Sequence, residues 1–198
     1  MNNVQIKLDE GAGKILYMIA GCNGAGKTTA FRNRLSKQFS VPIFINADEI
    51  ARDMCPEDVE SVAFDAGRIM LNRIEEQLEK DDSFCIETTL STRHYGKLVK
   101  RAQEKGFKVA LFFYWLESSE LAVCRVAQRV KSGGHNIPTD VIHRRYDRGI
   151  ANLFSIYLPI VDYWHIDNNS GFLPVQIAEG GKEVFDSNTF LKLQNYGK

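Results

Sequence analysis

The chain has 198 residues, of which 44% are hydrophobic and 25% charged, and this is the composition of an ordinary globular protein with a buried core. Its 25 basic residues balance its 25 acidic ones, and a net charge of zero argues against non-specific binding to nucleic acid or to an acidic membrane surface. No apolar run approaches the roughly 20 residues of a membrane span, and no leader peptide is apparent.

The four cysteines are scattered and include no C-x-x-C pair, so we expect a protein of a reducing cytoplasm. Cys85 and Cys124 lie within apolar segments, and both are predicted to be buried thiols.

Strand-like and helix-like segments alternate along the chain. Short apolar runs predict strands at residues 15–20, 41–46, 84–87, 107–116 and 163–167. Apolar residues at three- and four-residue spacing predict a long amphipathic helix over residues 59–78, and further helices are expected at 28–35, 95–105, 118–130 and 139–153. A β-hairpin around Gly180 and Gly181 and a short helix follow. This order predicts an α/β fold with a mostly parallel sheet, helices on both faces, and ligands at the carboxyl ends of the strands.

The most specific motif follows the first predicted strand. Residues 21–28 read Gly-Cys-Asn-Gly-Ala-Gly-Lys-Thr and match the phosphate-binding P-loop pattern G-x-x-x-x-G-K-[ST]. Glycines let backbone N–H groups converge on phosphate oxygens, and the next helix presents the positive end of its dipole. Lys27 is expected on the terminal phosphates and Thr28 on Mg²⁺. The predicted nucleotide-binding residues are Gly21, Asn23, Gly24, Ala25, Gly26, Lys27, Thr28 and Thr29. The alternative is a glycine turn without a ligand.

Acidic residues end the second and third predicted strands, at the edge that the P-loop also reaches. Asp48 is placed to orient and deprotonate an acceptor hydroxyl or to hold magnesium through water, and its alternative role is the N-cap of the following helix. Glu87 ends an apolar strand in the manner of a Walker B acid and is a candidate for magnesium or substrate. Thr88 and Arg93 are further substrate candidates. A strand-end acid paired with a surface lysine is the alternative for Glu87.

Arginines on two predicted helices flank a glycine-containing loop at residues 131–138. Arg125 and Arg129 are four residues apart on one helix and therefore share a face, while Arg144 and Arg145 lie on the next helix. This arrangement predicts a lid that closes over the triphosphate and stabilises the transferring charge, with His135 as a further phosphate contact. The alternative is a solvated basic helix face with nearby acidic partners.

A second basic cluster lacks interleaved aromatic residues, so a solvated helix face is favoured over a nucleic-acid site. It consists of Lys97, Lys100, Arg101, Lys105 and Lys108. The N-K-x-D and D-x-x-G tetrapeptides of G-proteins are absent from the chain. The small size, the acid after the second strand and the arginine lid together favour a phosphotransferase for a small acceptor.

These motifs resemble those of the zeta toxin-like P-loop kinases. The resemblance rests on residues 21–29, Asn-Ala-Asp at 46–48, Ile-Glu-Thr at 86–88, and the run from Arg129 through Gly-Gly-His-Asn-Ile-Pro to Arg-Arg-Tyr at 144–146. It continues with Asn-Leu at 152–153, Tyr157, Asp-Tyr-Trp at 162–164 and residues 167–171. It covers roughly residues 15 to 171 and is strongest for the compact branch described only as predicted ATPases or kinases.

In the characterised toxins of this family, ATP phosphorylates the 3′-hydroxyl of UDP-N-acetylglucosamine and related sugar nucleotides. The resemblance therefore implies ATP and Mg²⁺ as cofactors, a UDP-N-acetyl sugar as a candidate acceptor and an antitoxin protein as a candidate partner. Lys27 and Thr28 match the nucleotide and magnesium residues, and Asp48 matches the acid that activates the acceptor hydroxyl. Glu87 matches the acid after the third strand, and Arg125 or Arg129 a lid arginine. Where the toxins place a second lid arginine, this chain has Gly-Gly-His at residues 133–135.

We therefore expect residues 1–198 to form one P-loop kinase-like domain, with a core at about 13–170, a lid at about 125–148 and a C-terminal appendage at about 171–198. The expected activity is transfer of the γ-phosphoryl group of ATP to a small-molecule hydroxyl, without nucleic acid or membrane as a partner. The alternatives are a protein that binds or hydrolyses ATP without an acceptor, and a toxin–antitoxin component that acts through a protein partner. An end-processing polynucleotide kinase is disfavoured by the zero net charge.

Overall fold

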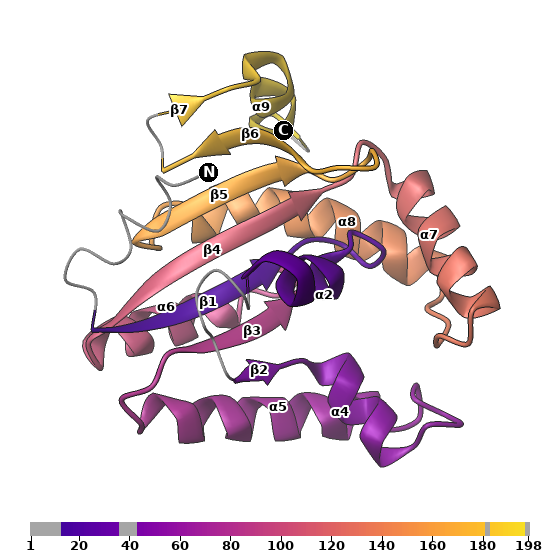
Figure 1. Cartoon of the computed structure of the whole chain (residues 1–198), viewed down its shortest axis with the longest axis horizontal. Coiled ribbons are helices and arrows are strands. Elements are labelled where there is room, and N and C mark those ends of the chain that lie inside the picture. Colours follow the sequence, from indigo (N-terminus) through magenta and orange to yellow (C-terminus); the bar gives the residue numbers. More distant parts are fainter. Residues whose placement is uncertain (1–12, 36–42, 181–182, 197–198) are drawn as a thin grey trace.

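The computed structural model describes residues 13–35, 43–180 and 183–196 of the chain. The strands are β1 (Lys14–Ala20), β2 (Phe44–Ile45), β3 (Phe84–Thr88), β4 (Phe107–Trp115), β5 (Tyr163–Asn168), β6 (Val175–Glu179) and β7 (Glu183–Val184). They form one sheet in the order β2-β3-β1-β4-β5-β6-β7 (Figure 1). The first five strands are parallel, and β6 and β7 continue the sheet antiparallel. The predicted mostly parallel sheet is thus confirmed.

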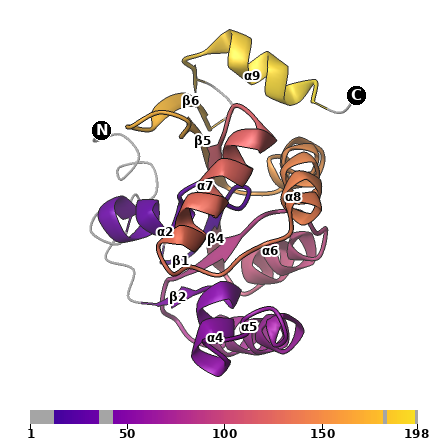
Figure 2. The same cartoon turned by 90° about the vertical axis from the view of Figure 1, so that its right-hand side faces the viewer.

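The helices are α2 (Lys27–Ala30), α4 (Ala47–Met54), α5 (Ala63–Leu78), α6 (Tyr95–Glu104), α7 (Ser119–Lys131), α8 (Thr139–Asn152) and α9 (Ser187–Gln194). Two of them continue as π-helical turns, α2 into η1 (Phe31–Leu35) and α8 into η2 (Leu153–Tyr157). Helix α2 lies on one face of the sheet, and α6 and α8 lie on the other (Figures 1 and 2). The predicted cover of helices on both faces is therefore present.

Most predicted elements begin and end within a few residues of the observed ones, but three differences are clear. The long helix begins at Ala63 rather than at residue 59, because Ser61 N donates to Asp58 Oδ1 in a turn that precedes it. The second strand is short, and residues 41–42 of its predicted range lie outside the described residues, as does Gly181 of the predicted hairpin. Cys85 is buried as predicted, but Cys124 is exposed, so that prediction was wrong.

The core lies along the two central strands. β1 and β4 are buried along nearly their whole length, with Leu16, Met18 and Leu111 fully inaccessible. Parallel strands covered by helices on both faces are buried on both sides, which explains why their sequences are continuous apolar runs rather than alternating patterns.

The register of the sheet brings the carboxyl ends of three neighbouring strands together. Ala20 of β1 is opposite Thr88 of β3, and Ile45 of β2 is opposite Ile86 of β3. The loop after β1, the start of α4 after β2 and the last residues of β3 therefore meet at one edge of the sheet. In an open α/β sheet, ligands bind at this edge.

The basic cluster on and after α6 is largely neutralised by acidic side chains. Arg101 makes a two-pronged contact with Glu75 at 2.6 Å for both nitrogen–oxygen pairs, and Lys105 lies 2.8 Å from a carboxylate oxygen of Glu79. Lys108 is paired with Asp162. Three of the five cations thus have counter-charges, as a solvated helix face predicts. In the part of the chain that the structure describes, no helix is both long and apolar enough to cross a membrane.

Candidate active site

Three glycines of the loop between β1 and α2, Gly21, Gly24 and Gly26, have positive φ angles, and two of them also pack closely against other backbone. Gly21 and Gly24 have φ angles of 140° and 79°, in the region that disfavours side chains. A Cβ atom on Gly21 would lie 2.3 Å from the carbonyl oxygen of Tyr114, and one on Gly24 would lie 2.8 Å from the carbonyl oxygen of Ala122. The loop therefore packs against the backbone of β4 and α7, and its shape is set by these close approaches.

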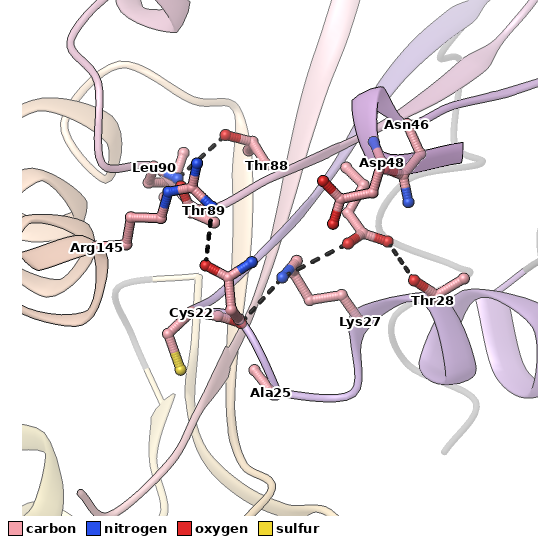
Figure 3. A network of polar contacts seen from close by, with 12 residues as sticks. Cys22, Ala25, Lys27, Thr28, Asn46, Asp48, Thr88, Thr89, Leu90 and Arg145 are labelled. Carbon is pink, nitrogen blue, oxygen red and sulfur yellow. Dashed lines mark hydrogen bonds and ion pairs between the residues drawn. The ribbon is translucent and has the colours of Figure 1, made fainter. Parts of the chain in front are cut away.

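Lys27 and Thr28 both contact Glu87 across the sheet edge. Lys27 Nζ donates to the carbonyl oxygen of Cys22 at 2.9 Å and lies 3.5 Å from Glu87 Oε1. The Thr28 hydroxyl donates to Glu87 Oε2 at 2.7 Å. Figure 3 shows Lys27 and Thr28 turned toward the space beneath Asp48. The Walker A lysine and threonine and the acid that ends β3 thus form one contact network.

Asp48 lies in the first turn of α4 with its carboxylate open to ligands. The N-cap of this helix is Asn46, whose side-chain oxygen accepts from Asp48 N at 2.8 Å (Figure 3). The side chain of Asp48 is 39% exposed and is not used for capping. The alternative role of Asp48 as an N-cap was therefore wrong, and Asn46 had no signal of its own beyond its place in Asn-Ala-Asp.

A cavity of about 350 Å³ joins these groups. It brings together most of the residues expected from the sequence, and it adds arginines and a glutamate that were not expected. It is lined by Asn23, Gly24, Gly26, Lys27, Thr28, Thr29, Arg32, Asn46, Asp48, Glu49, Arg52, Glu87, Arg125 and Arg129.

The two predicted lid arginines of α7 line this cavity. Arg125 donates to the carbonyl oxygens of Asn169 and Ser170 at 2.8 Å, and Arg129 donates to the carbonyl oxygen of His135 at 3.2 Å. His135 Nε2 lies 3.7 Å from Asp48 Oδ2, although His135 is not among the residues that line the cavity.

Two buried nitrogen atoms of the lid, Arg129 Nε and His135 Nδ1, have no hydrogen-bond partner among the described residues. Burial lowers the pKa of His135, and the carboxylate of Asp48 opposes this shift.

The remaining predicted residues lie outside the cavity. Arg145 Nη1 donates to Asn23 Oδ1 at 3.1 Å and so contacts the P-loop from α8. The side chain of Arg144 is 51% exposed, and its Nη1 lies 3.8 Å from Asp140 Oδ2. Thr88 accepts from Leu90 N and shapes the loop after β3, and Arg93 is exposed. Neither Thr88 nor Arg93 lines the cavity.

A second cavity of about 540 Å³ adjoins the first on the other side of α2. The two cavities share Gly26, Thr29 and Arg125. The loop after β5 supplies an apolar wall of Phe172, Leu173 and Pro174, which sequence reasoning missed.

Asn169, at the base of this loop, belongs to the run 167–171 that carries the family resemblance, but its contact with the P-loop was not predicted. Its Nδ2 donates to the carbonyl oxygen of Ala25 at 2.7 Å and fixes the P-loop. The signals for it were its place in that run and its position after a predicted strand at the ligand-binding edge.

The donor set at the sheet edge suits magnesium. A threonine hydroxyl and the carboxylates of Glu87 and Asp48 are hard oxygen ligands, and Mg²⁺ prefers one or two such groups together with water and phosphate oxygens. No group of three or more His, Cys, Asp or Glu side chains suited to a metal occurs among the described residues. A site that depends on the phosphates of a nucleotide needs no such group.

Two solved structures share the fold of this chain over nearly its whole length. AvrRxo1-ORF1:-ORF2 with ATP has a TM-score of 0.74 and 17% identity and covers 96% of this chain; this chain spans 66% of that one, just under two thirds of its length. A structure of the PezAT chromosomal toxin–antitoxin system of Streptococcus pneumoniae has a TM-score of 0.70 and 19% identity, covering 98% of this chain and 85% of that one. These likenesses show a P-loop kinase fold.

Sequence comparison is more specific. A curated protein of uncharacterised function from Haemophilus influenzae is 35% identical over 126 residues, which are 64% of this chain and 88% of that protein. The model of a family described as Zeta toxin matches residues 3–157, well over half of the chain. The chain, which has the P-loop, Asp48 and Glu87 at one sheet edge, therefore belongs to the Zeta toxin family.

Proposed function

We propose that this protein is an ATP-dependent kinase that transfers the γ-phosphoryl group to a hydroxyl of a small molecule. The observation that carries the proposal is the cavity that Lys27 and Thr28 share with Asp48. The carboxylate of Asp48 is exposed to this cavity and is not used for capping the helix. A phosphate-binding loop and a solvent-accessible carboxylate in one cavity are what phosphoryl transfer to a hydroxyl requires.

The two adjoining cavities would bind different parts of ATP, the phosphoryl donor. The first contains the P-loop side chains and would hold the phosphates, and the second has an apolar wall that suits a planar base. Gly26 and Thr29 line both, so a nucleotide that passes over the start of α2 would occupy both at once. Phe172 is 99% exposed at the rim of the second cavity, where a base would cover it.

Each group around the first cavity has a distinct task in the transfer. Asp48 would accept the proton of the acceptor hydroxyl as its oxygen attacks the γ-phosphorus, and ADP would leave. Lys27 and Arg129 would neutralise the negative charge of the phosphates. Thr28 and Glu87 would hold Mg²⁺, which when bound stabilises charge on the transferring phosphoryl group.

The lid would complete the site when substrates bind. Arg129 Nε and His135 Nδ1 are buried donors or acceptors that lack protein partners among the described residues, and a bound phosphate offers partners for such groups. Closure would also exclude water, which competes with the acceptor hydroxyl. Family membership adds the 3′-hydroxyl of a UDP-N-acetyl sugar as a specific candidate acceptor.

The proposal is tested by incubating the protein with ATP, Mg²⁺ and either UDP-N-acetyl sugars or a small-molecule cell extract. Mass spectrometry then searches for compounds that gain one phosphoryl group. The Lys27→Ala variant is the blank, because loss of the P-loop lysine removes the charge that binds the terminal phosphates. We expect phosphorylated products with the wild-type protein only. Consumption of ATP without any phosphorylated compound would instead support a plain ATPase.

A second candidate function is that of a toxin–antitoxin component with a protein partner. The PezAT structure comes from such a system, and the C-terminal region of this chain carries exposed apolar side chains. Val184, Phe185 and Leu191 are all more than 40% exposed. Growth arrest on expression that is relieved by coexpression of a neighbouring gene product would support this function, and harmless expression would contradict it.

A further inference from the structure

Arg52 lines the first cavity from the same helix that carries Asp48. It follows Asp48 by four residues on α4, and residues at this spacing lie on the same face of a helix. Both side chains, with Glu49 of the same helix, line the cavity of about 350 Å³. A cation and a carboxylate thus border the cavity on the side of α4, opposite the P-loop.

The guanidinium of Arg52 differs from the other arginines of this cavity. Arg32 is paired with Glu49 at 2.8 Å, and Arg125 and Arg129 donate to backbone carbonyl oxygens. With the residues that the structure describes, Arg52 forms neither a hydrogen bond nor an ion pair. Its charge is therefore available to a ligand.

The position of Arg52 places this charge near the reacting hydroxyl rather than near the triphosphate alone. Burial is the main reason that the pKa of His135 is lowered, and the positive charges of Arg129 and Arg52 lower it further. Arg52 and Asp48 line the cavity from the same helix, and Asp48 Oδ2 lies 3.7 Å from His135 Nε2. In the proposed function, the acceptor hydroxyl lies beside Asp48, while Lys27 and the lid arginines are occupied by ATP.

We propose that the acceptor carries an anionic group, a phosphate or a carboxylate, beside its reacting hydroxyl, and that Arg52 binds this group. The inference rests on the proposed kinase function, because it names the substrate class of the same site. Arginine binds phosphates and carboxylates through paired hydrogen bonds of matching geometry. The cavity also lies at the low end of the volumes of small-molecule sites and must take the transferred phosphoryl group, so a compact acceptor fits it best.

A purely structural role for Arg52 makes different predictions. Arg52 lies in the last turn of α4, where a cation interacts favourably with the helix dipole. Loss of that interaction would lower the melting temperature and leave the KM for the acceptor unchanged. Loss of an acceptor contact would raise that KM and leave the melting temperature nearly unchanged. The two measurements together separate the roles.

The test separates a small-molecule cell extract on an anion-exchange resin into a flow-through and a retained anionic fraction. Each fraction is incubated with the protein, Mg²⁺ and ATP labelled in the γ-phosphoryl group. A portion of the retained fraction is first treated with alkaline phosphatase, which removes phosphomonoesters but spares carboxylates and phosphodiesters. Arg52→Ala and Arg52→Lys are compared with the control Arg68→Ala, an exposed arginine of α5 that does not line the cavity.

We expect label to enter a compound of the retained fraction. Arg52→Ala should raise the KM for that compound roughly 10- to 100-fold, as loss of a hydrogen bond to a charged group does. Arg52→Lys should recover part of the loss, and Arg68→Ala should behave as wild type. Sensitivity to the phosphatase identifies a phosphomonoester, and resistance identifies a carboxylate or a diester such as a sugar nucleotide.

Transfer of label to a flow-through compound would overturn the anionic acceptor and leave the kinase function standing. An unchanged KM in Arg52→Ala would also overturn the role of Arg52. Absence of transfer in both fractions, with ATP shown to bind, would overturn the kinase function and with it this inference.

Discussion

Arg145 on α8 donates a hydrogen bond to the side chain of Asn23 in the P-loop, 122 residues earlier in the chain. The nitrogen–oxygen distance is 3.1 Å, and Asn23 is buried. This contact joins the second arm of the lid to the loop that binds phosphate. A movement or substitution of Arg145 would therefore alter a contact of the P-loop directly.

Replacing Arg145 by alanine should weaken nucleotide binding. The change leaves the buried oxygen of Asn23 without its donor, and an unsatisfied buried polar group costs about 1–3 kcal/mol. We expect the KM for ATP to rise roughly 5- to 150-fold. The matched control is Arg144→Ala, because Arg144 faces Asp140 in solvent. If steady-state kinetics show that Arg144→Ala raises the KM for ATP as much as Arg145→Ala does, the role given to the Arg145–Asn23 contact is wrong.

Replacing Asp48 by asparagine should abolish phosphoryl transfer while ATP still binds. Asparagine keeps the size of the side chain but cannot accept the proton of the acceptor, and general-base catalysis contributes about 10²- to 10⁴-fold. We expect kcat to fall by that factor with little change in the dissociation constant of ATP, measured by calorimetry. Asp53→Asn, on the same helix but outside the cavity, is the control. Transfer that survives Asp48→Asn would exclude Asp48 as the base.

Replacing Gly21 by alanine should destabilise the P-loop. The new Cβ would lie 2.3 Å from the carbonyl oxygen of Tyr114, so the backbone has to move. A strained backbone of this kind costs about 1–3 kcal/mol. Gly67→Ala on α5 is the control, because no atom lies within 4 Å of the added Cβ. We expect this change to stabilise the protein by about 0.5–1 kcal/mol, with urea unfolding as the measurement for both variants.

Cys22 in the P-loop should resist alkylation. Burial raises the pKa of this thiol to about 11, although the nearby charge of Lys27 opposes the shift. The reactive thiolate is therefore scarce at neutral pH, whereas Cys124 is exposed. Peptide mass spectrometry after treatment with iodoacetamide should find Cys124 modified before Cys22. Modification of Cys22 first would show that the loop opens readily to solvent.

The stability of the protein should fall as the pH drops below the usual pKa of histidine. Burial lowers the pKa of His135 in the folded state from its usual value of 6.5. Below that value the unfolded chain binds a proton that the folded state does not, so acidification favours unfolding. Thermal melting between about pH 7.5 and about pH 5.5 should show this loss, and His135→Gln should reduce the slope. An identical slope in the variant would assign the pH dependence to other groups.

Much of the site follows from the order of strands and motifs. The P-loop, Asp48 and Glu87 each end a predicted parallel strand, and such ends meet at one edge of the sheet. Side-chain contacts between segments far apart in the sequence could not be predicted from the order of strands and motifs. Asn169 donates to the P-loop carbonyl of Ala25 from 144 residues away, and its place after a predicted strand does not identify that partner.

The apolar sequence around Cys124 led to a wrong prediction of its burial. Cys124 lies in an apolar segment, but burial on a helix depends on which face a residue occupies. Its neighbour Ala122 is buried, whereas Cys124 lies on the solvent side of α7. The arrangement of residues 1–198 as one domain stays a prediction.

The most direct test of the proposed kinase follows the γ-phosphoryl group of ATP in water enriched in ¹⁸O. The reaction contains Mg²⁺ and the small-molecule extract, and mass spectrometry reads the isotope content of all products. Attack by an acceptor hydroxyl yields a phosphorylated compound whose new phosphoryl group carries no ¹⁸O, and we predict this result. Recovery of the γ-phosphoryl group only as inorganic phosphate with one ¹⁸O atom would mean that water is the acceptor, and it would contradict the account.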